Sequence, residues 1–409
     1  MIRKQFTILL LCFIPLYLHP QNNYSRYNFL NLQDNTLKNT ENANHYNYLM
    51  DKFADLCQNK KEKISILHIG DSHMQAGFYS SEIKQNFQNY FTTDSLADMG
   101  LIFPYSAANT NNPADFKTTS SGNWMAHKAV TSKTKCKLGV TGIALCTNDT
   151  LASLTISLRD YYPMKQYAFD HARIFCSYPD SSYKIEINPA AKVMQAESFL
   201  NIEFKDFTDS IKIKIEKNNP TDTSHFKMTG IQLINSNHSL SYHAAGVNGA
   251  KAKSYLSCEL FSDQLRVLNP DWVIISLGTN EAYNQNLKKE PFQKNLKELV
   301  HRIQNNTDST WILLNTPGDA MYKRDKRNPN NNLVRKEIIN VARETNCSYW
   351  DFYQVMGGNQ SIDAWYSSEL TAHDKLHLNK SGYQVKGNLF FDAFLSSFQP
   401  FFKAKLKNK

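Results

Sequence analysis

Residues 64–73 read Ile-Ser-Ile-Leu-His-Ile-Gly-Asp-Ser-His, and this stretch decides the fold. Its first six residues form an apolar run that is bounded by charged residues before it and by Gly70 after it. A short apolar run between such boundaries is typical of a buried parallel strand. Residues 78–91 follow with apolar side chains at helical spacing. The stretch therefore predicts a strand, a tight turn that carries Ser72, and a helix.

The same alternation of strand and helix returns after residue 240. Two further buried strands are predicted over residues 272–277 and 311–314. Helices are predicted over residues 253–268, 291–305, 333–345 and about 380–398. Strands that alternate with helices indicate a parallel sheet that is covered on both faces.

The stretch between these two parts has a different pattern, because its apolar residues alternate with polar ones. The clearest alternating runs are residues 151–158, 183–187, 199–204, 211–215 and 231–234. Period-two alternation at this spacing predicts antiparallel strands in a sandwich, and we find no internal repeat. The chain of 409 residues is also long for one compact domain. We therefore predict an α/β domain over residues 51–103 and 238–409, interrupted by a β-rich insert over residues 104–237.

The N-terminus has the pattern of a signal peptide over residues 1–20. Arg3 and Lys4 precede an apolar run over residues 6–18, which is too short to cross a bilayer comfortably. A retained N-terminal anchor is the alternative. Residues 21–50 are rich in Asn and Tyr and are expected to form a flexible leader or one that lies along the surface of the protein. The mature protein is expected in the periplasm or outside the cell, without stable membrane insertion, and an association with the cell envelope stays open.

Charge and cysteine content exclude some classes of protein. The net charge is +9, but the lysines are dispersed apart from those of the C-terminal tail, which argues against nucleic-acid binding and fits an ordinary solvated surface. Removal of residues 1–20 leaves six cysteines, and the three within residues 136–176 are the best candidates for a disulfide. No Cys-x-x-Cys pair is present, so zinc and redox sites are poorly supported. No cofactor is implied.

Four short segments lie at or just after predicted strands, where open α/β sheets place their active sites. They are Gly70–His73, Gly246–Ala250, Gly278–Glu281 and Asp374–His377. Each alone is weak evidence, because such segments commonly form turns, helix caps or surface pairs. Their chemistry is nevertheless complementary. A serine can act as nucleophile, and an Asp and a His three residues apart can meet on one face of a turn. Glycine N–H groups and an Asn amide can stabilise an oxyanion.

In their order and their predicted elements, the four segments closely resemble the blocks of the SGNH (GDSL-like) hydrolases. The resemblance covers residues 60–92 and 240–400, but not the insert. It implies a flavodoxin-like three-layer α/β/α fold that is interrupted here by a β-sandwich-like insert. It also implies roles for single residues: Ser72, Asp374 and His377 form the catalytic triad, and the Ser72 and Gly249 N–H groups with the Asn280 side chain form the oxyanion hole. Asp71 supports the loop, and His73 stands where many family members have Leu.

The resemblance also suggests a function. The layout is closest to that of exported peptidoglycan and carbohydrate O-acetylesterases, whose inserted β-rich module is carbohydrate-binding-like. The expected substrate is therefore an acylated glycan or another ester, and the expected activity is hydrolysis of O-acetyl groups. Aromatic residues of the insert that could stack on sugar rings or simply pack in its core are Trp124, Tyr161, Tyr162 and Tyr167.

Four alternatives remain open. The same residues could transfer an acetyl group to a glycan, or the chain could be an inactive glycan-binding protein, although the complete set of site residues argues against the second. A lipase is less attractive, because no long apolar lid segment lies near the motifs. A metal cluster could be drawn from six residues, but they lack a helical His-x-x-x-His spacing. These residues are His68, Asp71, His73, His373, Asp374 and His377. The oligomeric state cannot be inferred.

Overall fold

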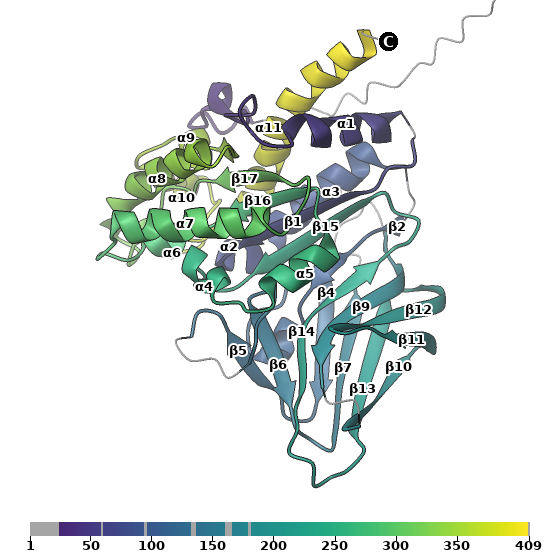
Figure 1. The fold of residues 1–409 in the computed structure, drawn as a ribbon. Helices are drawn as coiled ribbons and strands as arrows, with labels where there is room; N and C mark the ends of the chain where they lie inside the picture. The colour runs from purple at the N-terminus through teal and green to yellow at the C-terminus, as the bar shows by residue number, and fades with distance from the viewer. Residues whose placement is uncertain are drawn as a thin grey trace, which may run out of the picture.

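The central sheet of the α/β domain has five parallel strands in the order β15-β1-β16-β17-β20. Their bounds are Leu240–Gly246 for β15, Ile64–Gly70 for β1, Trp272–Ser276 for β16, Trp311–Asn315 for β17 and Ser348–Trp350 for β20. In chain order this is second, first, third, fourth and fifth, which is the strand order of flavodoxin-like folds. The expected fold class is therefore confirmed (Figure 1).

This computed structural model describes residues 24–58, 60–93, 96–131, 136–159, 166–178 and 181–407. The predicted signal peptide over residues 1–20 lies outside the described residues, as do Tyr161 and Tyr162. None of the described helices combines the length and the apolar character that a membrane span requires.

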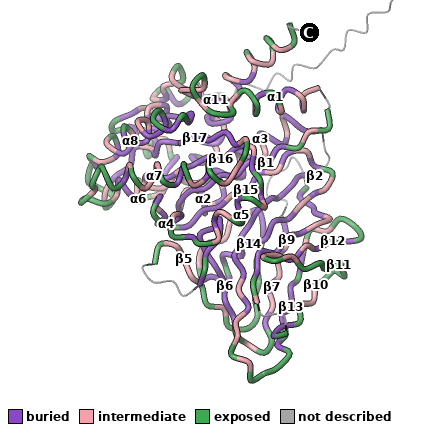
Figure 2. Tube along the Cα trace, in the orientation of Figure 1, coloured by how far each residue is buried: buried purple, intermediate pink, exposed green. Residues whose placement is uncertain are grey.

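Helices cover both faces of the sheet and create two separate cores (Figure 1). On one face lie α1 (Tyr46–Cys57), α3 (Phe78–Phe91) and α11 (Lys380–Lys407), and on the other lie α4 (Ala252–Leu256), α5 (Phe261–Leu268), α7 (Lys289–Gln304) and α8 (Asn330–Glu344). Successive residues of β16 face opposite sides, so Trp272 and Ile274 join the first core while Val273 and Ile275 join the second. The strands are buried on both faces, as their continuous apolar sequences predict (Figure 2).

Short elements complete the α/β domain and lie mostly in its loops. They are η1 (Leu32–Asp34), α2 (Ser72–Gln75), α6 (Thr279–Ala282), β18 (Met321–Tyr322), β19 (Lys326–Arg327), α9 (Phe352–Val355) and α10 (Ser361–Ser367). The predicted helices over residues 78–91, 291–305 and 333–345 are confirmed within a few residues, and the helix predicted over about 380–398 begins as predicted but continues to Lys407. The helix expected over residues 253–268 is instead divided into α4 and α5. The Arg302 guanidinium donates to the carbonyls of Tyr255, Leu256 and Cys258, which ends α4 there.

The insert is a sandwich of two antiparallel sheets, as the alternating pattern predicts. One sheet contains β4 (Phe116–Ser121), β7 (Leu151–Leu158), β10 (Tyr183–Asn188) and β13 (Ser210–Lys217). The other contains β3 (Gly100–Ile102), β5 (Met125–Lys128), β6 (Ile143–Thr147), β9 (Phe169–Ser177), β11 (Ala191–Gln195), β12 (Phe199–Thr208) and β14 (Phe226–Ile234). The short pair β2 (Leu96–Ala97) and β8 (Gln166–Tyr167) and the turn η2 (Tyr105–Ala108) complete it. Because β3 precedes residue 104, the sandwich begins before the predicted insert boundary.

Two further features of the sequence, its cysteines and its N-terminal segment, have counterparts in the structure. A disulfide within residues 136–176 is confirmed, since Cys136 and Cys146 are bonded and Cys176 is free. For the described part of the leader, the structure agrees with a segment that lies along the protein surface and not with a flexible one. From residue 24 onward this segment packs on the α/β domain, where Tyr27, Leu30 and Leu37 are buried.

Helix α11 approaches the loop before it so closely that only glycine fits at position 382. A Cβ atom on Gly382 would lie 1.9 Å from the carbonyl oxygen of Leu370. We expect Gly382→Ala to lower the free energy of unfolding by about 1–2 kcal/mol, because a clash with backbone outweighs the helix propensity gain of about 1 kcal/mol. Urea denaturation would measure this. Ser381→Ala, one position earlier and exposed, is the matched control. Equal stability of the two variants would contradict the close approach.

Candidate active site

Ser72 stands at the start of α2, directly after β1, where its hydroxyl leaves the sheet at the carboxyl end of the strand. Asp71 holds this turn. Its Oδ1 accepts the N–H of His73 at 3.0 Å, and its backbone carbonyl accepts the N–H groups of Met74 at 3.1 Å and Gln75 at 3.0 Å. The turn therefore fixes the position of Ser72 without using its side chain.

Ser72, His377 and Asp374 form a continuous hydrogen-bonded chain. The Ser72 Oγ lies 2.9 Å from the Nε2 of His377, and the Nδ1 of His377 lies 2.7 Å from the Oδ2 of Asp374. The other carboxylate oxygen of Asp374 accepts the N–H groups of Leu376 and His377, each at 3.0 Å. Both carboxylate oxygens are thus engaged, which locks the acid and the imidazole in one geometry. The His377 and Asp374 side chains remain about one-third exposed, at 34% and 36%, so this chain borders solvent.

The electrostatics of the pair favour a proton acceptor at His377. The hydrogen bond to Asp374 raises the pKa of His377 above its ordinary value, although partial burial opposes the shift. Burial alone would raise the pKa of Asp374, but hydrogen bonds from the His377 ring and from two backbone N–H groups outweigh it and hold that pKa well below its usual range. Asp374 is therefore ionised at neutral pH and stabilises a positive charge on His377.

The predicted oxyanion donors converge beside this chain. Gly249 is exposed with φ at +82°, and a Cβ placed there would contact only Val130, at 3.8 Å. Among the described residues, no group accepts the backbone N–H of Ser72 or of Gly249. The Asn280 Nδ2 donates to the carbonyl of Ala250 at 3.0 Å and to the Oδ2 of Asp71 at 3.2 Å. Asn280 thus joins the segments of Ser72 and Gly249, and its longer bond to Asp71 is the weaker of the two.

Two buried ionisable groups, Asp71 and Lys386, contribute to the electrostatics of the site. Burial raises the pKa of Asp71 to about 6, and burial lowers the pKa of Lys386 to about 8. The opposite charges of Lys386 and Asp71 counteract these shifts. The Lys386 ammonium lies 4.4 Å from the ring centroids of Tyr79 and of Phe352. Sequence reasoning missed Lys386, because a lysine in a predicted helix is normally part of a solvated face.

His73 has a packing role beside the catalytic imidazole. Its ring lies 5.1 Å from the ring of His377, and its Nδ1 lies 2.9 Å from the hydroxyl of Tyr383. Burial lowers the pKa of His73 well below its ordinary value, and the neighbouring His377 and Lys386 act in the same direction. His73 is therefore neutral, and it restricts the ring of His377 through contact rather than charge.

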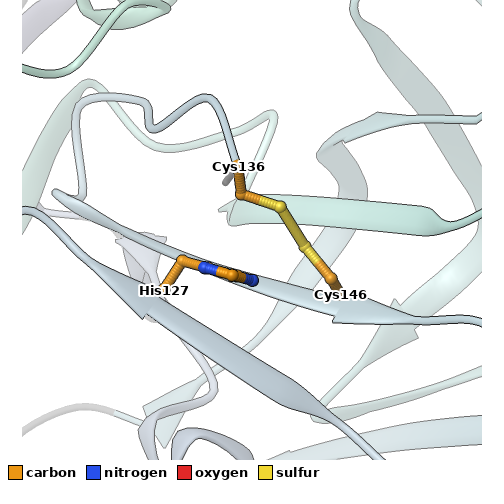
Figure 3. A group of neighbouring side chains, drawn as sticks. All are labelled: His127, Cys136 and Cys146. Atoms are coloured by element: carbon orange, nitrogen blue, oxygen red, sulfur yellow. A yellow bond between two sulfur atoms is a disulfide. The ribbon is translucent and has the colours of Figure 1, made fainter. Parts of the chain in front are cut away.

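The six residues of the alternative metal cluster do not converge. His68 is buried in β1 and bonds to Tyr242 and Ser276, while His373 is exposed. Within the described ranges, one group of potential ligands lies elsewhere, in the insert, where His127, Cys136 and Cys146 place their ligand atoms within 4.8 Å of one another. Figure 3 shows that the two sulfur atoms of this group are joined in a disulfide. They are therefore not available as thiolate ligands in this state.

Two of the four aromatic residues that were considered for sugar stacking, Trp124 and Tyr167, lie within the described part of the insert, and they differ in exposure. Tyr167 is buried, with the Lys84 ammonium 4.6 Å from its ring centroid. Trp124 is half-buried, packs near Phe226 and donates its Nε1–H to the carbonyl of Ser121 at 3.0 Å. The burial of Tyr167 favours the packing interpretation for this residue, whereas part of the Trp124 ring is exposed.

Comparisons with known proteins agree with this layout. Residues 229–385 match the model of the GDSL-like Lipase/Acylhydrolase family. This range includes Gly249, Asn280, Asp374 and His377, whereas Ser72 precedes it because the insert separates β1 from the rest of the sheet. No curated protein matches the sequence significantly.

Among solved structures, the chain is similar to a peptidoglycan O-acetylesterase, with 20% identity and a TM-score of 0.71 over 86% of this chain and 96% of that chain. It also matches the acetylxylan esterase Axe2 from Geobacillus stearothermophilus, with 19% identity and a TM-score of 0.32 over 39% of this chain and 73% of that chain. The SGNH-like layout expected from the sequence is thus confirmed, and residues 229–385 resemble an acylhydrolase family.

The buried carboxyl group of Glu281, which follows Asn280 in sequence, makes the stability of the protein depend on pH. The Glu281 Oε1 accepts the Ala252 N–H at 2.9 Å, its Oε2 has no hydrogen-bond partner among the residues that the structure describes, and burial raises its pKa to about 7 from an ordinary value of 4.5. Between pH 4.5 and pH 7, Glu281 holds a proton in the folded chain and has released it in the unfolded chain. The free energy of unfolding therefore falls as the pH rises through this range.

Glu281→Gln removes this titration while keeping the shape of the side chain. We expect the variant to gain about 3 kcal/mol relative to the wild type between pH 4.5 and pH 8. Denaturant unfolding of both proteins at the two pH values would measure the difference. A stability difference that does not change with pH would contradict the buried, protonated state of Glu281.

Proposed function

We propose that this protein is a serine esterase that removes O-acetyl groups from a polysaccharide through a Ser72–His377–Asp374 triad. The observation that carries the proposal is the hydrogen-bonded chain from the Ser72 Oγ to His377 at 2.9 Å and onward to Asp374 at 2.7 Å. Its order and spacing are those that nucleophilic catalysis by serine requires.

The first half of the reaction forms an acyl-enzyme. The Ser72 Oγ attacks the ester carbonyl while His377 Nε2 takes its proton, and Asp374 stabilises the resulting imidazolium. The carbonyl oxygen becomes an oxyanion, which accepts hydrogen bonds from the Ser72 and Gly249 N–H groups. Asn280 contributes its amide by giving up or sharing the longer, 3.2 Å bond to Asp71. When the tetrahedral intermediate collapses, the bond to the sugar oxygen breaks and His377 returns its proton to that oxygen.

The second half releases the acid. Water gives a proton to His377 and attacks the acyl carbonyl, and the Ser72 oxygen then leaves and recovers its proton from His377. The product is acetate, and the triad returns to its starting state. Transfer to a second sugar hydroxyl would replace water in this step, so acetate release in water distinguishes hydrolysis from transfer.

Two features support a glycan as the substrate. The similar structure that covers 86% of this chain is a peptidoglycan O-acetylesterase. In addition, the donors and the triad border solvent, as the modest exposure of His377 and Asp374 shows, which suits a polymer better than an enclosed pocket would. Export of the protein, which the N-terminal sequence pattern predicts, would place it among envelope polysaccharides.

Hydrolysis of p-nitrophenyl acetate tests the serine mechanism. We expect Ser72→Ala and His377→Ala to reduce kcat/KM by at least about a thousandfold, because each removes a member of a unit that acts together. Circular dichroism and Tm should match the wild type in both variants. Acetate release from O-acetylated peptidoglycan and xylan then identifies the glycan. Equal hydrolysis rates in the three folded proteins would contradict the proposed nucleophile.

The pH dependence of kcat/KM tests the role of Asp374. Because neutral His377 is the base, activity rises with pH through a pKa that lies above the ordinary imidazole value of 6.5. In Asp374→Asn, loss of the carboxylate lowers that pKa, so the acidic limb moves to lower pH and the maximal rate falls by about 10³–10⁴-fold. His373→Asn, an exposed histidine on the same loop, is the control. An unchanged acidic limb in Asp374→Asn would show that another group controls it.

A further inference from the structure

A cleft opens beside the triad acid, on the side of His377 that faces away from Ser72. It is lined by Tyr283, Met321, Lys323, Arg324, Asp374 and Leu376 and has a volume of about 250 Å³. A liquid water occupies about 30 Å³, so the cleft has the volume of about eight waters, comparable to one sugar ring with its substituents. Only the imidazole of His377 separates the Asp374 that lines it from Ser72. The cleft thus lies where the next sugar of a bound chain would pass.

The cations of this cleft are available to a ligand. Nearby, Arg327 and Lys375 both pair with Asp363. In contrast, Lys323 and Arg324 are exposed, and no carboxylate of the described chain lies within ion-pair distance of either. Asp374 also lines the cleft, but both of its oxygens already accept hydrogen bonds from its own loop. The cleft therefore presents two positive charges that no carboxylate of the described chain neutralises, and the Lys323 ammonium lies 5.4 Å from the ring centroid of Tyr322.

The backbone at these two residues has an unusual conformation. Lys323 and Arg324 have φ values of +51° and +73°, in the left-handed region, which costs a residue other than glycine about 1–2 kcal/mol. They form the turn between β18 and β19, where Gly or Asn would be less strained. Long cationic side chains stand there in spite of this cost, which favours a function for their charge over a purely structural turn.

Hydrogen bonds tie the walls of the cleft to the loop that carries Asp374 and to the helix that carries Asn280. The Met321 N–H donates to the carbonyl of Lys375 at 2.9 Å, which ties the turn to the loop of Asp374. The Lys323 N–H donates to the hydroxyl of Tyr283 at 3.3 Å, and Tyr283 follows the helix that carries Asn280. The half-buried Tyr283 ring packs against Tyr322 with centroids 4.9 Å apart. An aromatic face beside two cations suits a sugar ring that carries a negative charge.

We propose that this cleft is a subsite for an acidic sugar, so that the substrate is a carboxylate-bearing polysaccharide rather than a neutral one. Lys323 and Arg324 bind the carboxylate of the sugar next to the acetylated one, and Tyr283 contacts its ring. The proposal rests on the proposed esterase function for its substrate class, but binding to the cleft can be measured without catalysis.

The kinetic test compares O-acetylated polygalacturonate with the same polymer after reduction of its carboxylates and renewed acetylation. The double variant Lys323→Asn/Arg324→Asn removes the charge and keeps residues that tolerate the left-handed conformation. We expect the wild type to have an about tenfold lower KM for the acidic polymer, and the variant to lose this preference. Added salt should weaken it in the wild type, because the charges are exposed. Lys288→Gln/Lys326→Gln, with the same net charge but outside the cleft, should behave as the wild type.

A binding test separates the two proposals. Calorimetry with Ser72→Ala protein and unacetylated oligogalacturonate should give binding that weakens about tenfold when Lys323 and Arg324 are replaced by Asn, and that does not change in the Lys288/Lys326 control. A wild type that hydrolyses p-nitrophenyl acetate but has equal KM values for both polymers overturns the acidic subsite alone. A wild type that hydrolyses no ester overturns the esterase, and the calorimetry then decides the subsite by itself. If oligogalacturonate binding weakened equally in the Lys323/Arg324 and Lys288/Lys326 double variants, the ligand would be attracted by the net charge of the protein alone. That result would also overturn the subsite.

Discussion

The parallel pairing of β1 with β15 on one side and β16 on the other is the constraint on which the site depends. In this register Gly70 lies opposite both Gly246 and Ser276, so the three strands end at the same level of the sheet. The segments that follow them carry Ser72, Gly249 and Asn280. Chain order reverses between β1 and β16, and such a switch point is where open α/β sheets form a crevice. The sheet therefore brings together three segments that are far apart in sequence, and the hydrogen bonds of Asn280 to Asp71 and to the Ala250 carbonyl then join them.

Close packing at these strand ends leaves no room for a side chain at Gly246 or Gly70. A Cβ on Gly246 would lie 2.5 Å from the Gln75 N, and one on Gly70 would lie 2.3 Å from the Met74 Cγ. Beneath the turn, the buried carboxyl of Asp71 accepts the His73 N–H and attracts the Lys386 ammonium. A buried carboxylate without such partners would be protonated and would lose its negative charge. The lysine thus links α11, whose N-terminal end follows the His377 loop, to the turn that presents Ser72.

Much of this arrangement could be predicted from the sequence, because strand and helix periodicities and the short polar segments are local signals. The parts that could not be predicted depend on contacts between distant residues. The packing of the N-terminal segment is one example: Asn35 bonds to the carbonyl of Leu389 and to the indole of Trp350, and nothing near Asn35 in sequence indicates either partner. The division of α4 from α5 by Arg302 and the burial of Lys386 have the same origin. The turn at Lys323 was missed because two strands of two residues leave no periodic pattern.

The position of the insert has a consequence for how the site can work. Because it lies between β1 and β15, its core is continuous with one face of the central sheet, where Leu67 and Ile69 meet residues of the sandwich. The Gln75 side chain extends this connection, since its Nε2 donates to Thr110 of the insert and its Oε1 accepts the Asn248 N–H beside Gly249. A shift of the sandwich would thus be transmitted to the turn that holds an oxyanion donor. The insert therefore acts as a structural wall of the site, and this role does not require it to bind sugar itself.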